Sequence, residues 1–265
     1  MGAGLSDEQC QRYDRDGYLS PLPVFDAEEV RDLRARFEAF EELHGSTLRT
    51  DLHLLEKWAW NAVTDGRVVD PVVALLGPDV LLWSLNWFIK EPGDGKIVSM
   101  HQDASYWGLQ PHDVVTAWIA LSPASVATGP MMFVPGSHKG ELKMHENTFA
   151  ADNLLTRGQT INEPDLQSRS KLAPLAAGEM SLHHVRLVHG SGENTTNDRR
   201  IGMVLRFCAT HVRQTKAADT AVLVAGQDHF GHFELLPAPQ QDFGEAEQVR
   251  HLDAVTKMGN IIMSD

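Results

Sequence analysis

Five short apolar runs between residues 80 and 208 constrain the fold of this chain more than any other feature of its sequence. Each run is rich in β-branched, aromatic and aliphatic residues, and segments with glycine and proline separate them. The runs cover residues 80–89, 114–121, 131–134, 179–188 and 201–208. Many short strands joined by such turns predict an antiparallel barrel or jelly roll.

Helices are predicted before this β region, in a helical N-terminal part of about residues 6–77. Ser6 with Gln9, and Asp26 with Glu29, match the capping-box pattern that begins a helix. Two further helices are expected at about 54–63 and 68–76. The sequence therefore predicts a mainly β fold with N-terminal helices, as one domain over residues 1–265.

The jelly-roll core is predicted over about residues 79–210. Within it, the segment of about 140–172 is polar and weakly periodic. We expect this segment to be a long, lid-like insertion between strands, because such insertions often cover the mouth of a site.

The charge and cysteine content narrow the expected partners. A formal net charge of -13 makes nucleic acid or an anionic membrane surface an unfavourable partner, and no apolar run is long enough to span a bilayer. Cys10 and Cys208 lie far apart without metal-site spacing, which favours a reduced, cytoplasmic protein. The expected partner is a small-molecule substrate, and the expected assembly is a monomer or homodimer.

His101, Asp103 and His189 form the first candidate site. Residues i and i+2 of a β-strand share a face, so His101 and Asp103 can reach one ion while Gln102 turns away. His189 ends an apolar run just before a glycine turn. Two histidines and one carboxylate are the ligand set of non-haem Fe(II) oxygenases. The spacing alone is equally compatible with a structural histidine beside a solvated aspartate.

Two other pairs share this spacing near the C-terminus. They are His251 with Asp253, and His232 with Glu234. No strand followed by a glycine turn comes after them to deliver a third ligand. We therefore expect neither pair to bind the metal.

An arginine eleven positions after His189 indicates a cosubstrate. 2-Oxoglutarate that chelates Fe(II) through its 1-carboxylate and 2-keto oxygens projects its 5-carboxylate away from the metal, where Arg200 can hold it with two parallel hydrogen bonds. Ser191 can add a hydroxyl donor. Arg199 is the alternative, and only one of the two adjacent arginines can point inward from a strand. The spacing does not choose between them.

Together these segments resemble one known family. The quoted segments are His101-Gln102-Asp103, Thr116-Ala117-Trp118, Pro135-Gly136-Ser137-His138, His189-Gly190-Ser191-Gly192-Glu193-Asn194 and Arg199-Arg200. They resemble the phytanoyl-CoA dioxygenase (PhyH-like) family of Fe(II)- and 2-oxoglutarate-dependent oxygenases, which have a double-stranded β-helix, or cupin-like jelly-roll, fold. The resemblance extends from about residue 16 to residue 206.

The resemblance assigns roles to individual residues. It implies that the catalytic residues His101, Asp103 and His189 bind Fe(II), which also takes O2. It chooses Arg200 over Arg199 and implies four contacts to 2-oxoglutarate: Arg200, Ser191, Trp118 and Asn86. Related halogenases have a small residue in place of the carboxylate, so an intact Asp103 favours hydroxylation.

The sequence indicates the substrate only in outline. Candidate substrate contacts are Tyr106, Trp107, His183, His184 and His53. Bacterial relatives with similar segments act on small polar metabolites, including aminophosphonates, or on natural-product intermediates. The implied reaction hydroxylates an unactivated C–H bond and releases succinate and CO2. Two alternatives are a cupin-like metalloenzyme that does not use 2-oxoglutarate and a non-catalytic metal-binding module.

Overall fold

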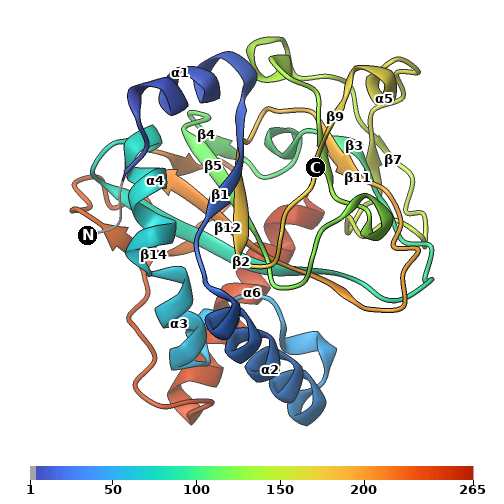
Figure 1. The fold of residues 1–265 in the computed structure, drawn as a ribbon. Coiled ribbons are helices and arrows are strands. Elements are labelled where there is room, and N and C mark those ends of the chain that lie inside the picture. Colours follow the sequence, from blue (N-terminus) through green and yellow to red (C-terminus); the bar gives the residue numbers. More distant parts are fainter. Residues whose placement is uncertain (1–3, 265) are drawn as a thin grey trace.

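Two sheets form the core of the computed structural model, which describes residues 4–264 (Figure 1). The larger sheet has the strand order β1-β10-β5-β12-β2-β14-β15 and the smaller one the order β3-β11-β6-β9. All pairings in both sheets are antiparallel except that of β14 with β15. The predicted jelly roll with N-terminal helices is confirmed. The strands of the larger sheet are β1 (Tyr18–Pro23), β10 (Glu179–His184), β5 (Val114–Ala120), β12 (Arg200–Ala209), β2 (Val80–Lys90), β14 (Thr220–Ala225) and β15 (Glu234–Leu235), and those of the smaller sheet are β3 (Val98–His101), β11 (His189–Ser191), β6 (Met131–Phe133) and β9 (Lys171–Ala173).

The sheet extends beyond the predicted core at both ends of the chain. Strand β1 precedes residue 79 and joins one edge through β10, while β14 follows residue 210 and pairs with β2. Two shorter strand pairs lie outside both sheets. These are β4 (Leu109–Gln110) with β13 (Arg213–Gln214), and β7 (Glu146–Asn147) with β8 (Gln159–Thr160).

Both predicted capping boxes are present at the first two helices. Ser6 caps α1 (Asp7–Asp16) and Asp26 caps α2 (Ala27–His44), in each case with the reciprocal hydrogen bond from the side chain at the third helical position. Helix α4 (Gly66–Leu76) also matches its prediction. Helix α3 (Lys57–Val63) is shorter than predicted, because residues Leu52–Leu54 form a separate 3-10 turn before it.

A C-terminal helix, α6 (Glu245–Met263), was not predicted. Its buried residues are spaced four and three apart, as in an amphipathic helix, but the first two are polar and hide the apolar pattern. They are Glu247, His251, Ala254, Met258 and Ile261. Within residues 4–264, no helix has the length and apolar content needed to cross a membrane.

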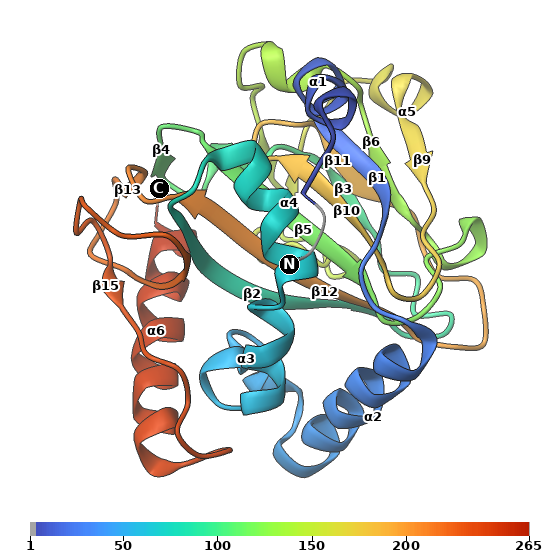
Figure 2. The same ribbon diagram turned by 60° about the vertical axis from the view of Figure 1, so that its left-hand side comes forward.

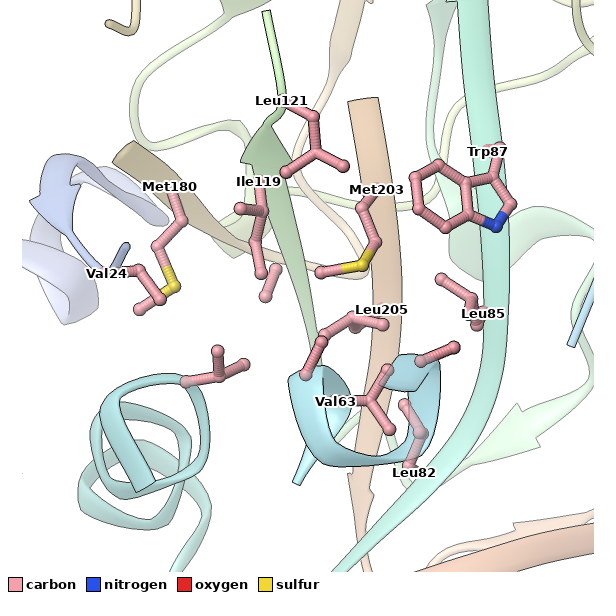
Figure 3. Packing of buried hydrophobic residues seen from close by; sticks show 14 of the residues in the cluster. Val24, Val63, Leu82, Leu85, Trp87, Ile119, Leu121, Met180, Met203 and Leu205 are labelled. Carbon is pink, nitrogen blue, oxygen red and sulfur yellow. The ribbon is translucent and has the colours of Figure 1, made fainter. Parts of the chain in front are cut away.

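Strand β12 divides its side chains between two environments. Ile201, Met203 and Leu205 belong to the main apolar core, which also contains buried side chains of α2, α3 and α4. Figure 3 shows Met203 and Leu205 beside Ile119 and Val63 in this core. Because successive residues of a strand point to opposite faces, Arg200, Gly202, Val204 and Arg206 share the other face. In Figure 2, α2 and α3 lie on one side of β12 and the smaller sheet lies on the other.

The segment predicted as an insertion lies against strand β3. It contains β7, β8 and the short helix α5 (Leu166–Arg169). Its backbone follows the edge of β3, since the amide of Leu154 donates to the carbonyl of Ile97 at 2.9 Å and that of Ile161 donates to Met100 at 2.8 Å. The insertion is therefore attached to the strand that ends at His101.

Phe37 tests whether α2 is held by core packing. It is fully buried and its ring stacks on Trp87 with centroids 4.0 Å apart, so Phe37→Ala should lower the free energy of unfolding by about 3–5 kcal/mol in urea denaturation. Leu43 on the same helix is 77% exposed, and Leu43→Ala should change it by less than about 0.5 kcal/mol. Equal effects of the two substitutions would contradict this packing.

Candidate metal centre

Three side chains converge where the smaller sheet ends. His101 is the last residue of β3 and His189 the first of β11, and the two are direct cross-strand partners. Figure 1 shows these two strands side by side. Nε2 of His101 lies 3.3 Å from Oδ1 of Asp103, and Nε2 of His189 lies 3.7 Å from Oδ2. Ligand atoms of the three residues all lie within 4.8 Å of one another, and all three residues are buried.

The local structure at Asp103 differs from the prediction. A strand that carries both His101 and Asp103 was expected, and this was wrong: β3 ends at His101 and Asp103 begins a 3-10 turn (Asp103–Ser105). Gln102 between them is nevertheless extended, with φ -125° and ψ 124°, so their side chains still share one side. Gln102 turns away as predicted, and its side chain donates to the carbonyl of Arg186 at 2.6 Å.

Backbone carbonyls orient both imidazole rings. Nδ1 of His101 donates to the carbonyl of Ser99 at 2.8 Å, and Nδ1 of His189 donates to that of Leu187 at 2.8 Å. Since a carbonyl can only accept, the proton of each neutral ring sits on Nδ1 and the lone pair on Nε2. This is the arrangement in which outer hydrogen bonds fix the tautomer of metal-binding histidines.

The electrostatics of the three residues favour their ligand forms. Burial opposes ionisation of Asp103, but His189 and His101 hold the pKa of its carboxyl below the ordinary value. Burial and the neighbouring His101 lower the pKa of His189 to about 4. At neutral pH the cluster therefore offers a carboxylate and a neutral imidazole. The hydroxyl of Tyr106 donates to Oδ1 of Asp103 at 3.1 Å and fixes the carboxylate further.

The donor set fits Fe(II). Two imidazole nitrogens and one carboxylate oxygen leave coordination positions for ligands other than the protein. Among the described residues this is the one cluster of histidine, cysteine and acidic side chains with metal-binding spacing. In the rejected pair, His251 bonds to the carbonyl of Thr50 at 2.7 Å and Asp253 forms an ion pair with Lys257 at 2.7 Å.

The structure distinguishes the two adjacent arginines. Arg200 is 1% exposed, its Nη1 donates to the carbonyl of Gly129, and its guanidinium lies 5.2 Å from the ring centroid of Trp118. Arg199 points the other way and pairs with Glu91 and Glu41 at 2.7 Å. The pocket beside the metal residues is lined by Arg200, Ser191 and Trp118.

Lys90 is a second buried basic residue, which the sequence analysis missed. It is the cross-strand partner of Arg200, and its Nζ donates to Oγ of Ser191 at 2.7 Å and to the carbonyl of Gly192. Burial and the nearby Arg200 lower the pKa of Lys90 to about 6. The sequence signal that could have singled out Lys90 is its position at the end of an apolar strand. Its pairing with Arg200 could not be foreseen, because that depends on strand register.

Gly202 makes room for the wall of this pocket. A Cβ atom at this position would lie 2.2 Å from Cζ2 of Trp118, so the indole can cross β12 only because the residue is glycine. The same ring covers the guanidinium of Arg200. The shape of the pocket around Arg200 therefore depends on Gly202, two residues further along the strand.

Asn86 does not lie with Arg200. Its amide nitrogen donates to Oγ1 of Thr50 at 3.1 Å and its oxygen accepts from Arg206. Asn86 and Arg206 both line a neighbouring cavity of about 160 Å³. The structure thus places Asn86 beside a second buried arginine, which the sequence analysis did not single out.

The remaining candidates divide between the pocket and its surroundings. Trp107 and His183 line the pocket of the metal residues, and Tyr106 lines the neighbouring cavity. His184 faces the other way, toward His138, with ring centroids 5.3 Å apart. His53 is buried at the helices, with its ring 6.4 Å from that of Trp60. Neither His184 nor His53 lines the pocket, so the structure does not bring them to the metal residues.

His145 links the insertion to the metal loop. Its Nε2 accepts a hydrogen bond from the amide of Gln102 at 2.8 Å, while its Nδ1 bonds to the carbonyl of Lys143. The amide of Lys143 in turn donates to the side chain of Gln102 at 2.8 Å. The insertion therefore holds Gln102, the residue between two predicted ligands, by both its backbone amide and its side chain.

Comparisons with known proteins agree with this geometry. The family model described as phytanoyl-CoA dioxygenase (PhyH) matches residues 13–202. The chain is 28% identical over 228 residues to a probable alpha-ketoglutarate-dependent hypophosphite dioxygenase of Stutzerimonas stutzeri, covering 76% of this chain and 78% of that protein. It is 29% identical over 218 residues to an ectoine dioxygenase of Bordetella parapertussis, covering 72% and 71%. A solved structure of the non-heme monooxygenase ThoJ matches with a TM-score of 0.86 and 29% identity over 96% of this chain and 97% of that one.

Asp103 and Asp253 allow a matched test of the metal centre. Both lie in a His-x-Asp sequence, but only Asp103 faces two imidazoles. Asp103→Asn should weaken Fe(II) binding by roughly 100-fold or more, because the variant loses the anionic ligand. Asp253→Asn should leave it unchanged. Anaerobic equilibrium dialysis measures both, and equal Fe(II) affinity of the two variants would refute the assignment.

Proposed function

The chain belongs to the phytanoyl-CoA dioxygenase (PhyH) family of Fe(II)- and 2-oxoglutarate-dependent dioxygenases, and we propose that it hydroxylates an unactivated C–H bond of a small, polar metabolite. In this proposal His101, Asp103 and His189 hold the iron. Arg200, Lys90 and Ser191 hold the 5-carboxylate of 2-oxoglutarate. The three metal residues line one pocket with Arg200 and Ser191, and Lys90 bonds to Ser191. The proposal rests on this arrangement.

The observation that carries the proposal is a pair of buried basic side chains, those of Lys90 and Arg200, without a counterion. Across residues 4–264, no carboxylate oxygen lies within 4.0 Å of the side-chain nitrogens of Lys90 or Arg200, although both residues are at most 1% exposed. Burying a charge without a partner is costly, and two like charges side by side increase the cost. A bound dicarboxylate supplies the missing negative charge. A cupin-like enzyme that does not use 2-oxoglutarate has no need for these cations.

Iron and 2-oxoglutarate, when bound, supply the oxidising chemistry that consumes O2 and releases succinate and CO2. The residues of the protein bind the metal and the cosubstrate and orient them. The backbone carbonyls of Ser99 and Leu187 fix the two imidazoles, and Tyr106 fixes Asp103. Trp118 and Val204 line the pocket with apolar surface, which excludes water and strengthens the hydrogen bonds of Arg200 to a carboxylate.

The size of the cavity supports a small substrate. The space beside Asn86 and Arg206 has a volume of about 160 Å³. This is below the roughly 300–1,000 Å³ typical of pockets for drug-sized ligands. One relative is named as a probable hypophosphite dioxygenase, and hypophosphite is a very small oxyanion. Both points favour a compact polar metabolite over a long acyl chain.

Adjacent arginines provide a direct test of cosubstrate binding. Arg200→Gln should weaken 2-oxoglutarate binding by about tenfold or more, because the variant loses a charge-assisted, two-point contact. Arg199→Gln should leave the affinity unchanged, since Arg199 points to Glu91 and Glu41. Anaerobic titration of the Fe(II) protein, followed by its visible charge-transfer absorption, measures the affinity.

The same titration tests the function itself. Wild-type protein that develops no absorption with 2-oxoglutarate, and forms no succinate in air, would refute the proposed function. Full 2-oxoglutarate affinity in Arg200→Gln would instead favour a different anchor for the cosubstrate. A metabolite screen read as succinate formation then identifies the substrate.

Lys90 should couple cosubstrate binding to a proton. The pKa of its ammonium is lowered to about 6 in the protein without 2-oxoglutarate, so at pH 7.5 Lys90 is mostly neutral. A carboxylate beside it favours the charged form and raises the pKa. Binding should therefore take up a proton, and the affinity should fall as the pH rises from about 6 toward the higher pKa of the complex.

Calorimetry in buffers of different ionisation enthalpy measures this proton uptake. The measurement uses the Zn(II)-loaded protein, because zinc has no redox chemistry. Wild-type protein should show uptake near pH 7.5, and Lys90→Met should show none. The same uptake in Lys90→Met would assign the proton to another group.

A further inference from the structure

We infer that Arg206 anchors an anionic group of the substrate, so that the substrate class of this enzyme is a small carboxylate, phosphonate or similar oxyanion. The inference rests on the proposed function, because it assumes that Arg200 and Lys90 are occupied by 2-oxoglutarate. It adds a specificity-determining residue at the other end of the same strand.

Strand geometry separates the two arginines. Arg200 and Arg206 are six residues apart on the inner face of β12, which places their Cα atoms about 20 Å apart at roughly 3.4 Å per residue. Both line the pocket of the metal residues, but only Arg206 also lines the neighbouring cavity of about 160 Å³. The 5-carboxylate held by Arg200 therefore leaves Arg206 without a ligand.

Arg206 belongs to a polar row that crosses the larger sheet. Its cross-strand partners are Ser84 on β2 and Thr116 on β5, and Thr116 is in turn the partner of His183 on β10. The Oγ1 of Thr116 and the Nδ1 of His183 are buried without a hydrogen-bond partner. Buried polar atoms are normally paired, so unpaired ones in a row beside the metal residues indicate a polar ligand.

The guanidinium of Arg206 is held in place but not neutralised. Its Nη1 donates to Oγ of Ser84 at 3.0 Å and to Oδ1 of Asn86, and the ring of Trp107 lies 4.6 Å from its central carbon. These contacts orient the group with neutral partners. Its Nε is buried with no partner, and the residue is 7% exposed.

The acids near Arg206 have other partners. Within the described part of the chain, no carboxylate oxygen lies within 4.0 Å of its nitrogens. Asp103 faces His101, His189 and Tyr106. Asp51 accepts the amide of Leu85 at 2.7 Å, and burial raises its pKa to about 7. An oriented, buried cation that no carboxylate contacts directly is the arrangement that recognises carboxylates and phosphonates through two parallel hydrogen bonds.

The surroundings of Arg206 define the rest of the substrate. Tyr106, Trp107 and Phe88 give the cavity aromatic walls, and Leu154 and Leu155 of the insertion and Ile262 of α6 add aliphatic surface. A substrate with one anionic end and a short apolar body fits this distribution. Its body then lies toward the metal residues, because Phe88, Trp107 and Leu155 line both cavities.

Small probes with the same ethyl group and different head groups test the inference. Propionate, ethylphosphonate and neutral propionamide are titrated by ligand-detected NMR into Zn(II)-loaded protein saturated with 2-oxoglutarate. The wild type should bind at least one anion about tenfold more tightly than propionamide. The preferred anion identifies the head group as carboxylate or phosphonate. An equal affinity for all three probes would overturn the inference.

Two variants locate the anion at Arg206. Arg206→Gln should lose the preference for anions while its 2-oxoglutarate affinity, measured in the anaerobic titration, stays at the wild-type value. Asn86→Asp is a second variant that tests the inference if Arg206→Gln does not fold. It keeps the size of the side chain and gives Arg206 an internal counterion. It should lower anion affinity by about tenfold as well.

The outcomes separate the two proposals. Wild-type protein that does not bind 2-oxoglutarate contradicts the proposed function. Normal 2-oxoglutarate binding together with an undiminished anion preference in both variants contradicts only the role of Arg206. A parallel loss of 2-oxoglutarate affinity in Arg206→Gln would also overturn the inference, since it would assign the arginine to the cosubstrate.

Discussion

The pairing of β12 with β2 and β5 is the contact on which the site depends. All ten residues of β12 are buried, and the strand is hydrogen-bonded on both sides. One face contributes Ile201, Met203 and Leu205 to the core, so the strand cannot shift by one residue without placing arginines among the helices. The hydrophobic core thereby fixes the register that brings Arg200 opposite Lys90 and Arg206 opposite Thr116.

Much of this architecture could be predicted from local sequence patterns. The capping boxes, most of the short apolar runs and the turns between them depend on near neighbours, and the structure has them at nearly the predicted residues. The run 179–188 is an exception, because β10 ends at His184 and His189 begins β11 in the other sheet. The alternation of side chains along a strand also predicted that Arg199 and Arg200 face opposite ways, and His183 and His184 likewise. Helix α6 was missed because Glu247 and His251 occupy buried positions that normally hold apolar residues.

The parts of the site that sequence patterns could not supply depend on contacts between distant segments. Lys90 and Ser191 are 101 residues apart, and Arg206 and Asn86 are 120 apart. Neither pair follows from spacing, because strand order and register decide which residues become neighbours. For the same reason the surroundings of Asn86 did not follow from the sequence. It was expected beside the cosubstrate, and its side chain lines the neighbouring cavity with Arg206.

Buried charge explains why this pocket is costly to the free protein and selective for its ligands. Lys90, Arg200 and Arg206 are buried basic side chains, and the hydrogen-bond partners of their nitrogens are carbonyls, hydroxyls and an amide. Each pays a desolvation cost that a neutral partner does not recover, whereas an anion does. Binding of anions to the folded state therefore also stabilises the fold by mass action. The insertion also contacts the metal residues' loop, because its His145 and Lys143 bond to Gln102, the residue between His101 and Asp103. Leu155 of the same insertion lines the pocket, so a ligand there contacts the segment that holds the loop of the metal residues.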